Sequence, residues 1–151
     1  MGLGFGLVIP LGAAYVQLGR VDMLALWAGL PFAFLIALVL YINQFPDLRA
    51  DSISGKRNWV VRLGARSARY GYPLLVAAAY FSLIIGVLLG PLPPYVLVGM
   101  LALPLHLRAL RLLWVEAGNP QSLRPAIEGT LNGTMLHGLL VVTGLMAPTF
   151  V

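Results

Sequence analysis

The sequence predicts an all-α, polytopic transmembrane helix bundle that forms one transmembrane domain over residues 1–151. Hydrophobic residues make up 60% of the chain and charged residues only 10%, a balance that excludes a water-soluble domain. Five largely uncharged windows are each long enough, or nearly so, to cross a hydrocarbon core of about 30 Å as a helix. The apolar residues in these windows are continuous rather than alternating, which favours helices over membrane-spanning strands.

The predicted spans run over residues 3–19, 23–42, 71–90, 94–114 and 134–150. The fourth is apolar only to Leu107, and it reaches full length because Arg108 and Arg111 can extend their charges toward the headgroups. The first competes with a signal peptide, but no basic segment precedes it and no clear small-residue cleavage site follows it. We therefore expect the first window to be a helix as well.

Nine of the ten basic residues fall in or beside two long connections, residues 43–70 and 115–133, whereas residues 20–22 and 90–94 are tight turns. Because basic loops stay in the cytoplasm, both long connections are predicted to lie on the cytoplasmic side of the inner (plasma) membrane. The net charge of +5 then belongs at the surface of the lipid bilayer, and we expect no nucleic-acid partner. The absence of Cys excludes a disulfide scaffold, a thiol nucleophile and a Cys-ligated metal centre.

The first long connection carries the residues that point to chemistry. Asp47 and Asp51 are four residues apart, so on a helix their carboxylates share one face about 6 Å apart. Two like charges at that spacing favour a divalent cation, and oxygen ligands without Cys or clustered His favour Mg²⁺ or Mn²⁺. Asn43 extends the spacing by one step and offers an amide oxygen. Since Mg²⁺ commonly joins carboxylates to phosphates, the neighbouring Lys56 and Arg57 indicate a diphosphate site.

A purely structural interpretation stands beside this one. The same carboxylates can pair with Arg49, Lys56 and Arg57 in a solvated loop at the membrane surface. The carboxylate pair alone does not separate the two interpretations.

The longer pattern resembles the second aspartate-rich motif of the UbiA superfamily of membrane prenyltransferases. The matching positions are Asn43, Asp47 and Asp51, followed by Gly55-Lys56-Arg57 and Val61-Arg62-Leu63-Gly64. Residues 12–19, which include Tyr15 and Gln17, and residues 134–140 are similar to the quinone-biosynthetic branch that prenylates dihydroxynaphthoate. The resemblance covers essentially the whole chain, which corresponds to the C-terminal half of a family member.

The resemblance implies the last five helices of a nine-helix bundle and the transfer of a polyprenyl group from an allylic diphosphate to an aromatic acceptor. It implies that Asp47 and Asp51, with Asn43, hold Mg²⁺ while Lys56 and Arg57 bind the polyprenyl diphosphate. A family member has a further aspartate-rich motif in an earlier loop, and no second carboxylate pair at helical spacing occurs here. This chain alone is therefore expected to be inactive, and an N-terminal half or a second chain is expected to supply that motif.

Four other residues are candidates for lesser roles, and simpler alternatives stand beside them. Tyr15 could offer a π face to a carbocation, or it could anchor its helix at the interface. Arg111 could reach a carboxylate of the acceptor or extend to the headgroups, and Arg62 most simply determines topology. Gln17 is a candidate through the resemblance alone.

The alternative function is a non-catalytic membrane module that binds lipid or assists assembly. A headgroup binder would gain from basic residues and lose from paired aspartates, so the presence of Asp47 and Asp51 favours the enzyme. His106 and His137 are expected either to orient the acceptor or to bond neighbouring helices.

Overall fold

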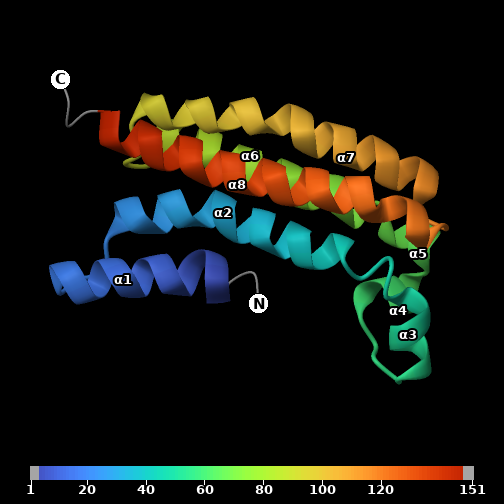
Figure 1. The fold of residues 1–151 in the computed structure, drawn as a ribbon. Coiled ribbons are helices and arrows are strands. Elements are labelled where there is room, and N and C mark those ends of the chain that lie inside the picture. Colours follow the sequence, from blue (N-terminus) through green and yellow to red (C-terminus); the bar gives the residue numbers. More distant parts are fainter. Residues whose placement is uncertain (1–3, 148–151) are drawn as a thin grey trace.

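The computed structural model describes residues 4–147, and within that range it contains helices and no strand (Figure 1). This confirms the predicted all-α class. The elements are η1 (Gly4–Val8, a π-helix), α1 (Ile9–Leu18), α2 (Met23–Ile42), α3 (Leu48–Ile53), α4 (Trp59–Leu63), α5 (Ala65–Ala68), α6 (Gly71–Leu88), η2 (Pro94–Ala102, a 3₁₀-helix), α7 (Leu103–Glu116), η3 (Pro120–Leu123) and α8 (Arg124–Met146).

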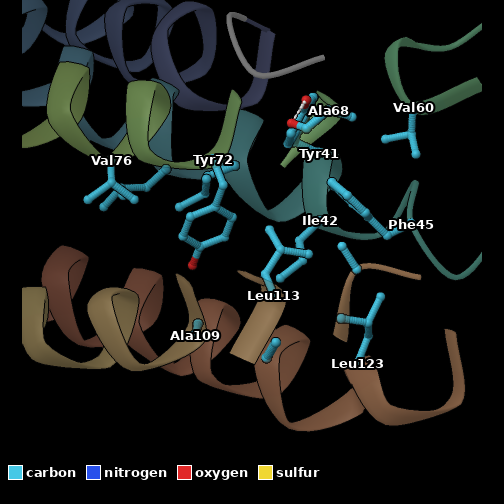
Figure 2. Packing of buried hydrophobic residues seen from close by; sticks show 14 of the residues in the cluster. Tyr41, Ile42, Phe45, Val60, Ala68, Tyr72, Val76, Ala109, Leu113 and Leu123 are labelled. Carbon is cyan, nitrogen blue, oxygen red and sulfur yellow. Dashed lines mark hydrogen bonds between the residues drawn. The ribbon is translucent and has the colours of Figure 1, made fainter. Parts of the chain in front are cut away.

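The long helices α2, α6, α7 and α8 form a bundle, and α1 lies along α2 (Figure 1). α2 packs on α6 and α8, and α8 packs on α7 and η2. At the end of the bundle that follows α2, Ile42, Phe45, Leu113 and Leu123 are all fully buried in one cluster (Figure 2). This packing fixes the end of α2 and therefore the start of the segment that carries Asp47.

Three helical stretches are long and apolar enough to cross a membrane: Met23–Ile42, Ala65–Leu88 and Pro94–Glu116. They correspond to the second, third and fourth predicted spans, while the first corresponds to the shorter apolar helix Gly4–Leu18. These stretches indicate a membrane protein, and the total of five spans stays a prediction. Residue 3 of the first predicted span and residues 148–150 of the fifth lie outside the described residues.

The second long connection differs from its predicted extent over residues 115–133. α7 continues to Glu116 and α8 already begins at Arg124, so the predicted loop is wrong over most of its length. A search for uncharged windows misses the first turns of α8, because Arg124 and Glu128 in those turns are charged. On the helix these side chains lie one turn apart, and Arg124 Nε donates to Glu128 Oε1 at 2.8 Å.

The first long connection, residues 43–70, contains the three short helices α3, α4 and α5, which stand at one end of the bundle (Figure 1). Gly55 follows α3 and Gly64 separates α4 from α5, with φ angles of 76° and 74° that favour glycine. Tyr41, near the end of α2, donates its hydroxyl hydrogen to the carbonyl oxygen of Ala68 at 2.5 Å (Figure 2). This bond ties the two ends of the connection together.

Candidate functional site

The two carboxylates indicated by the sequence lie on one helical turn. Asp47 immediately precedes α3, and the backbone N–H of Asp51 donates to the carbonyl oxygen of Asp47 at 2.8 Å. Asp47 is exposed and its side chain caps no helix, whereas Asp51 is only 9% exposed. The pair therefore combines one carboxylate open to solvent with one held against the fold.

Asp51 is held through both of its carboxylate oxygens. Lys56 Nζ donates to Oδ1 at 2.8 Å, and Asn58 Nδ2 donates to Oδ2 at 2.8 Å. The backbone carbonyl oxygen of Asp51 also accepts from Lys56 N at 2.9 Å and from Ser54 Oγ at 3.1 Å. The segment after α3 thus folds back over Asp51 and brings an ammonium and an amide to a single carboxylate.

Lys56 lies at the carboxylates but remains open to solvent, with its side chain 70% exposed. The hydrogen bond from Lys56 to Asp51 and the charge of Asp51 raise the pKa of Lys56 above its usual value, and Asp47 adds a smaller contribution. The ammonium is therefore fully charged at neutral pH. Arg57 is exposed and forms no ion pair within the described part of the chain, so its guanidinium can bind an anion.

Asn43 adjoins the end of α2, and its Nδ2 donates to the carbonyl oxygen of Val39 at 2.7 Å. Its amide oxygen accepts no hydrogen bond within residues 4–147. The described residues contain no group of three or more His, Cys, Asp or Glu side chains that could hold a metal. Two carboxylates and an amide oxygen nevertheless suit Mg²⁺, because this ion completes its shell with water and phosphate oxygens.

A cavity of about 1010 Å³ begins at Asp51 and continues between α2 and α6. Its polar lining includes Asp51, Lys56, Asn58 and Gln44, and the buried Oε1 atom of Gln44 has no hydrogen-bond partner among the described residues. Its apolar lining comes from α2, α4 and α6 and includes the side chains of Ala37, Leu40, Leu63, Leu74 and Leu75. A cavity with a charged end and an apolar body fits an amphiphile with an anionic head.

Of the main candidates, Asp51 and Lys56 line this cavity, whereas Asn43, Asp47 and Arg57 do not. None of the four lesser candidates lines it either. Tyr15 and Gln17 are exposed on α1, which connects to the start of α2. The carboxylates follow the other end of α2, and the two ends of this 20-residue helix are about 30 Å apart. Arg62 is exposed on α4 and Arg111 is exposed on α7, and neither lines the cavity.

The cavity lining that sequence reasoning missed includes Gln44, Asn58 and Trp59. Asn58 does carry a sequence signal, because Asn is favoured immediately before a helix. It caps α4, and its Oδ1 accepts from Val61 N at 2.8 Å. Gln44 and Trp59 carry no such signal, since only the fold brings them into the lining of the same cavity as Asp51.

His106 and His137 lie in a buried polar network between helices rather than in the lining of this cavity. His106 Nδ1 pairs with the hydroxyl of Tyr80 at 3.0 Å, and His137 Nδ1 donates to the carbonyl oxygen of Gly99 at 3.1 Å. These contacts agree with the expectation that both histidines bond neighbouring helices.

Comparison with known proteins places these features in a family. Residues 1–146 match the UbiA prenyltransferase family. The relatives include proteins named 1,4-dihydroxy-2-naphthoate octaprenyltransferase from Mycobacterium tuberculosis (34% identical over 95% of this chain and 47% of the relative), Mycobacterium leprae (37%, over 71% and 35%) and Escherichia coli (29%, over 93% and 46%).

The chain spans about half the length, or less, of these curated relatives. No solved structure matches it significantly. Because the family match extends over nearly the whole of this sequence, the chain belongs to the UbiA prenyltransferase family.

Proposed function

We propose that this chain forms the diphosphate-binding half of a membrane prenyltransferase. The complete enzyme transfers a polyprenyl group from an allylic diphosphate to an aromatic acceptor in menaquinone-type quinone biosynthesis. The observation that carries this proposal is the cavity beside Asp51, whose charged end and apolar body suit the head and tail of a polyprenyl diphosphate. The names of the curated relatives support a dihydroxynaphthoate as the acceptor.

Asp47, Asp51 and the amide oxygen of Asn43 are the groups that would hold Mg²⁺, which when bound neutralises charge on the departing diphosphate. Lys56 and Arg57 donate charge-assisted hydrogen bonds to the diphosphate oxygens. As the allylic C–O bond breaks, negative charge accumulates on the leaving group, and these donors stabilise that charge. Lys56 is bonded to Asp51 in the structure, so we expect its ammonium to move from the carboxylate to the diphosphate when substrate binds.

The apolar wall of the cavity has a separate task. Leu40, Leu63, Leu74 and Leu75 offer a surface on which a prenyl chain can lie without contact with water. An allylic carbocation survives only where water is excluded, so the same surface favours transfer to the acceptor over hydrolysis.

In this proposal the loop with Asp47 and Asp51 faces the cytoplasm from the inner membrane, because basic residues are concentrated on that side. The chain matches about half of its relatives, so we expect the remaining metal and substrate ligands to come from the other half of the fold or from a second chain. We expect the isolated chain to show no turnover.

Turnover in the full-length or complemented enzyme tests the proposal. Asp47→Asn and Asp51→Asn each remove a metal-binding charge and are expected to abolish prenyl transfer while membrane insertion is retained. Asp22→Asn is the matched control, because Asp22 caps the opposite end of α2 through Leu24 N and Asn caps helices equally well. Wild-type turnover in both site variants would reject the metal assignment and favour a non-catalytic membrane module.

A further inference from the structure

The side chain of Asn58 is fixed at both ends between two elements of the site. Its Nδ2 donates to Oδ2 of Asp51 on α3, and its Oδ1 accepts from the backbone N–H of Val61 on α4, both at 2.8 Å. A rotation of the amide that broke one bond would break the other as well. Asn58 is half-buried, and the carboxylate that it contacts is nearly buried.

The two oxygens of Asp51 therefore differ in what holds them. Oδ2 is bonded to an anchored amide, whereas Oδ1 is bonded to the ammonium of Lys56, which lies at the end of a long side chain that is 70% exposed. A cation on a flexible and solvated chain exchanges readily for another cation. An amide that also caps a helix has no comparable freedom.

We propose that Asn58 is a positioning residue of the metal site, which holds Oδ2 of Asp51 so that Oδ1 points to the place where a divalent cation replaces the ammonium of Lys56. This inference rests on the proposed function, because it takes Asp51 to be a metal ligand. Hydrogen bonds that orient a ligating carboxylate commonly determine metal affinity, and their loss costs about 10- to 100-fold.

Asn58→Ser separates the positioning role from the capping role. Serine caps helices as well as asparagine does, so α4 retains an acceptor for Val61 N, but the short hydroxyl replaces the amide that donates to Asp51. Asn58→Ala removes both functions. Asn119→Ser is the matched control in another loop, since Asn119 Nδ2 donates to Ser122 Oγ at 2.8 Å and lies far along the chain from Asp51.

The decisive measurement is Mn²⁺ binding to the purified full-length enzyme, followed by loss of the electron paramagnetic resonance signal of the free ion. We expect Asn58→Ser to raise the Kd for Mn²⁺ by about 10- to 100-fold and to raise the Mg²⁺ concentration for half-maximal turnover in parallel. The value of kcat at saturating Mg²⁺ should change little, and Asn119→Ser should match the wild type in every respect.

Two results would overturn the inference, and a third would overturn its foundation. Wild-type Mn²⁺ affinity in Asn58→Ser, alongside lost affinity in Asp51→Asn, would show that Asn58 does not position the ligand and would leave the proposed function intact. Reduced folding of Asn58→Ser and Asn58→Ala with unchanged affinity in the folded fraction would show a capping role only. Wild-type affinity in Asp51→Asn would remove the metal site itself.

Discussion

The ammonium of Lys56 donates a hydrogen bond to Oδ1 of Asp51, an oxygen that a metal ion would need. Removal of the Lys56 side chain is therefore expected to affect diphosphate binding and metal binding in opposite directions. Lys56→Ala deletes a donor to the diphosphate, and we expect a higher KM for polyprenyl diphosphate with a smaller change in kcat. The same substitution frees Oδ1 of Asp51, so Mn²⁺ should bind more tightly when diphosphate is absent. Steady-state kinetics and Mn²⁺ titration measure both effects, and an unchanged KM would leave Lys56 with a topological role alone.

The pH dependence of this ion pair follows from the raised pKa of Lys56. A raised pKa means that the pair stabilises the folded loop fully below the ordinary lysine pKa of 10.5, and the stabilisation is lost as pH rises through the higher folded value. Activity between roughly pH 6 and 9 should therefore not reflect titration of Lys56. The pH profile of Lys56→Arg should coincide with that of the wild type, and a displaced profile would contradict this expectation.

At the scale of single residues, the sequence predicts a candidate site residue when its type and spacing alone indicate a role. Asp47 and Asp51 are recognisable because four residues make one helical turn, and the backbone bond between them follows that spacing. Asn58 and Gln44 could not be assigned to the site in this way. Their roles depend on a turn that folds back over Asp51 and on burial between helices.

The turn between α3 and α4 depends on Gly55, which has a φ angle of 76° and open space around the position of a Cβ atom. Gly55→Ala is therefore strained only by its backbone conformation, at a cost of about 1 to 2 kcal/mol. We expect faster hydrogen exchange in residues 54–58 and weaker Mn²⁺ binding. Gly12→Ala, at an equally open position within α1, should show neither effect, and equal exchange in both variants would contradict the role of the turn.

Helices α6 and α7 are joined inside the bundle by the hydroxyl of Tyr80 and Nδ1 of His106, 3.0 Å apart. Hydrogen bonds between membrane helices contribute about 0.6 kcal/mol on average and up to about 1.7 kcal/mol. Tyr80→Phe should lower the free energy of unfolding within that range and leave Mn²⁺ binding unchanged. Tyr95→Phe at an exposed position is the control for unfolding in mixed micelles, and equal stability of both variants would exclude the proposed contribution.

At the scale of elements, α2 coincides with its predicted window because Asp22 caps its start and uncharged residues fill it as far as Ile42. The start of α8 could not be predicted from an uncharged window, because the charged residues Arg124 and Glu128 lie in its first half. Pro104 illustrates a third case. Proline lacks a backbone donor and disturbs a continuous helix, and in the structure the 3₁₀-helix η2 ends at Ala102 and α7 begins at Leu103, one residue before Pro104.

The whole molecule places the site at one end of the bundle and the turn between α1 and α2 at the other (Figure 1). The chain contains no Cys, so single introduced cysteines report sidedness directly. A membrane-impermeant maleimide should label Ser52→Cys only in inside-out vesicles and Val21→Cys only in right-side-out vesicles. Both positions are exposed, and the reverse pattern would contradict a cytoplasmic site.

The cavity is a property of the whole molecule that the sequence does not predict. Its walls come from α2, from the segment around α3 and α4, and from the start of α6, which are separated along the chain. The sequence predicts the chemistry of the cavity better than its shape, because Asp51 and Lys56 are close in sequence, while only packing brings Leu40 and Leu74 to the same cavity.

Asp47 and Asp51 are proposed to bind a prenyl diphosphate through a divalent cation. Calorimetric binding of an unreactive polyprenyl thiodiphosphate to the full-length enzyme tests this most directly. Binding should require Mg²⁺, persist in Asp22→Asn, and be lost when Asp47→Asn and Asp51→Asn are combined. Binding of the analogue by the combined variant as tightly as by the wild type, with Mg²⁺ present, would contradict it.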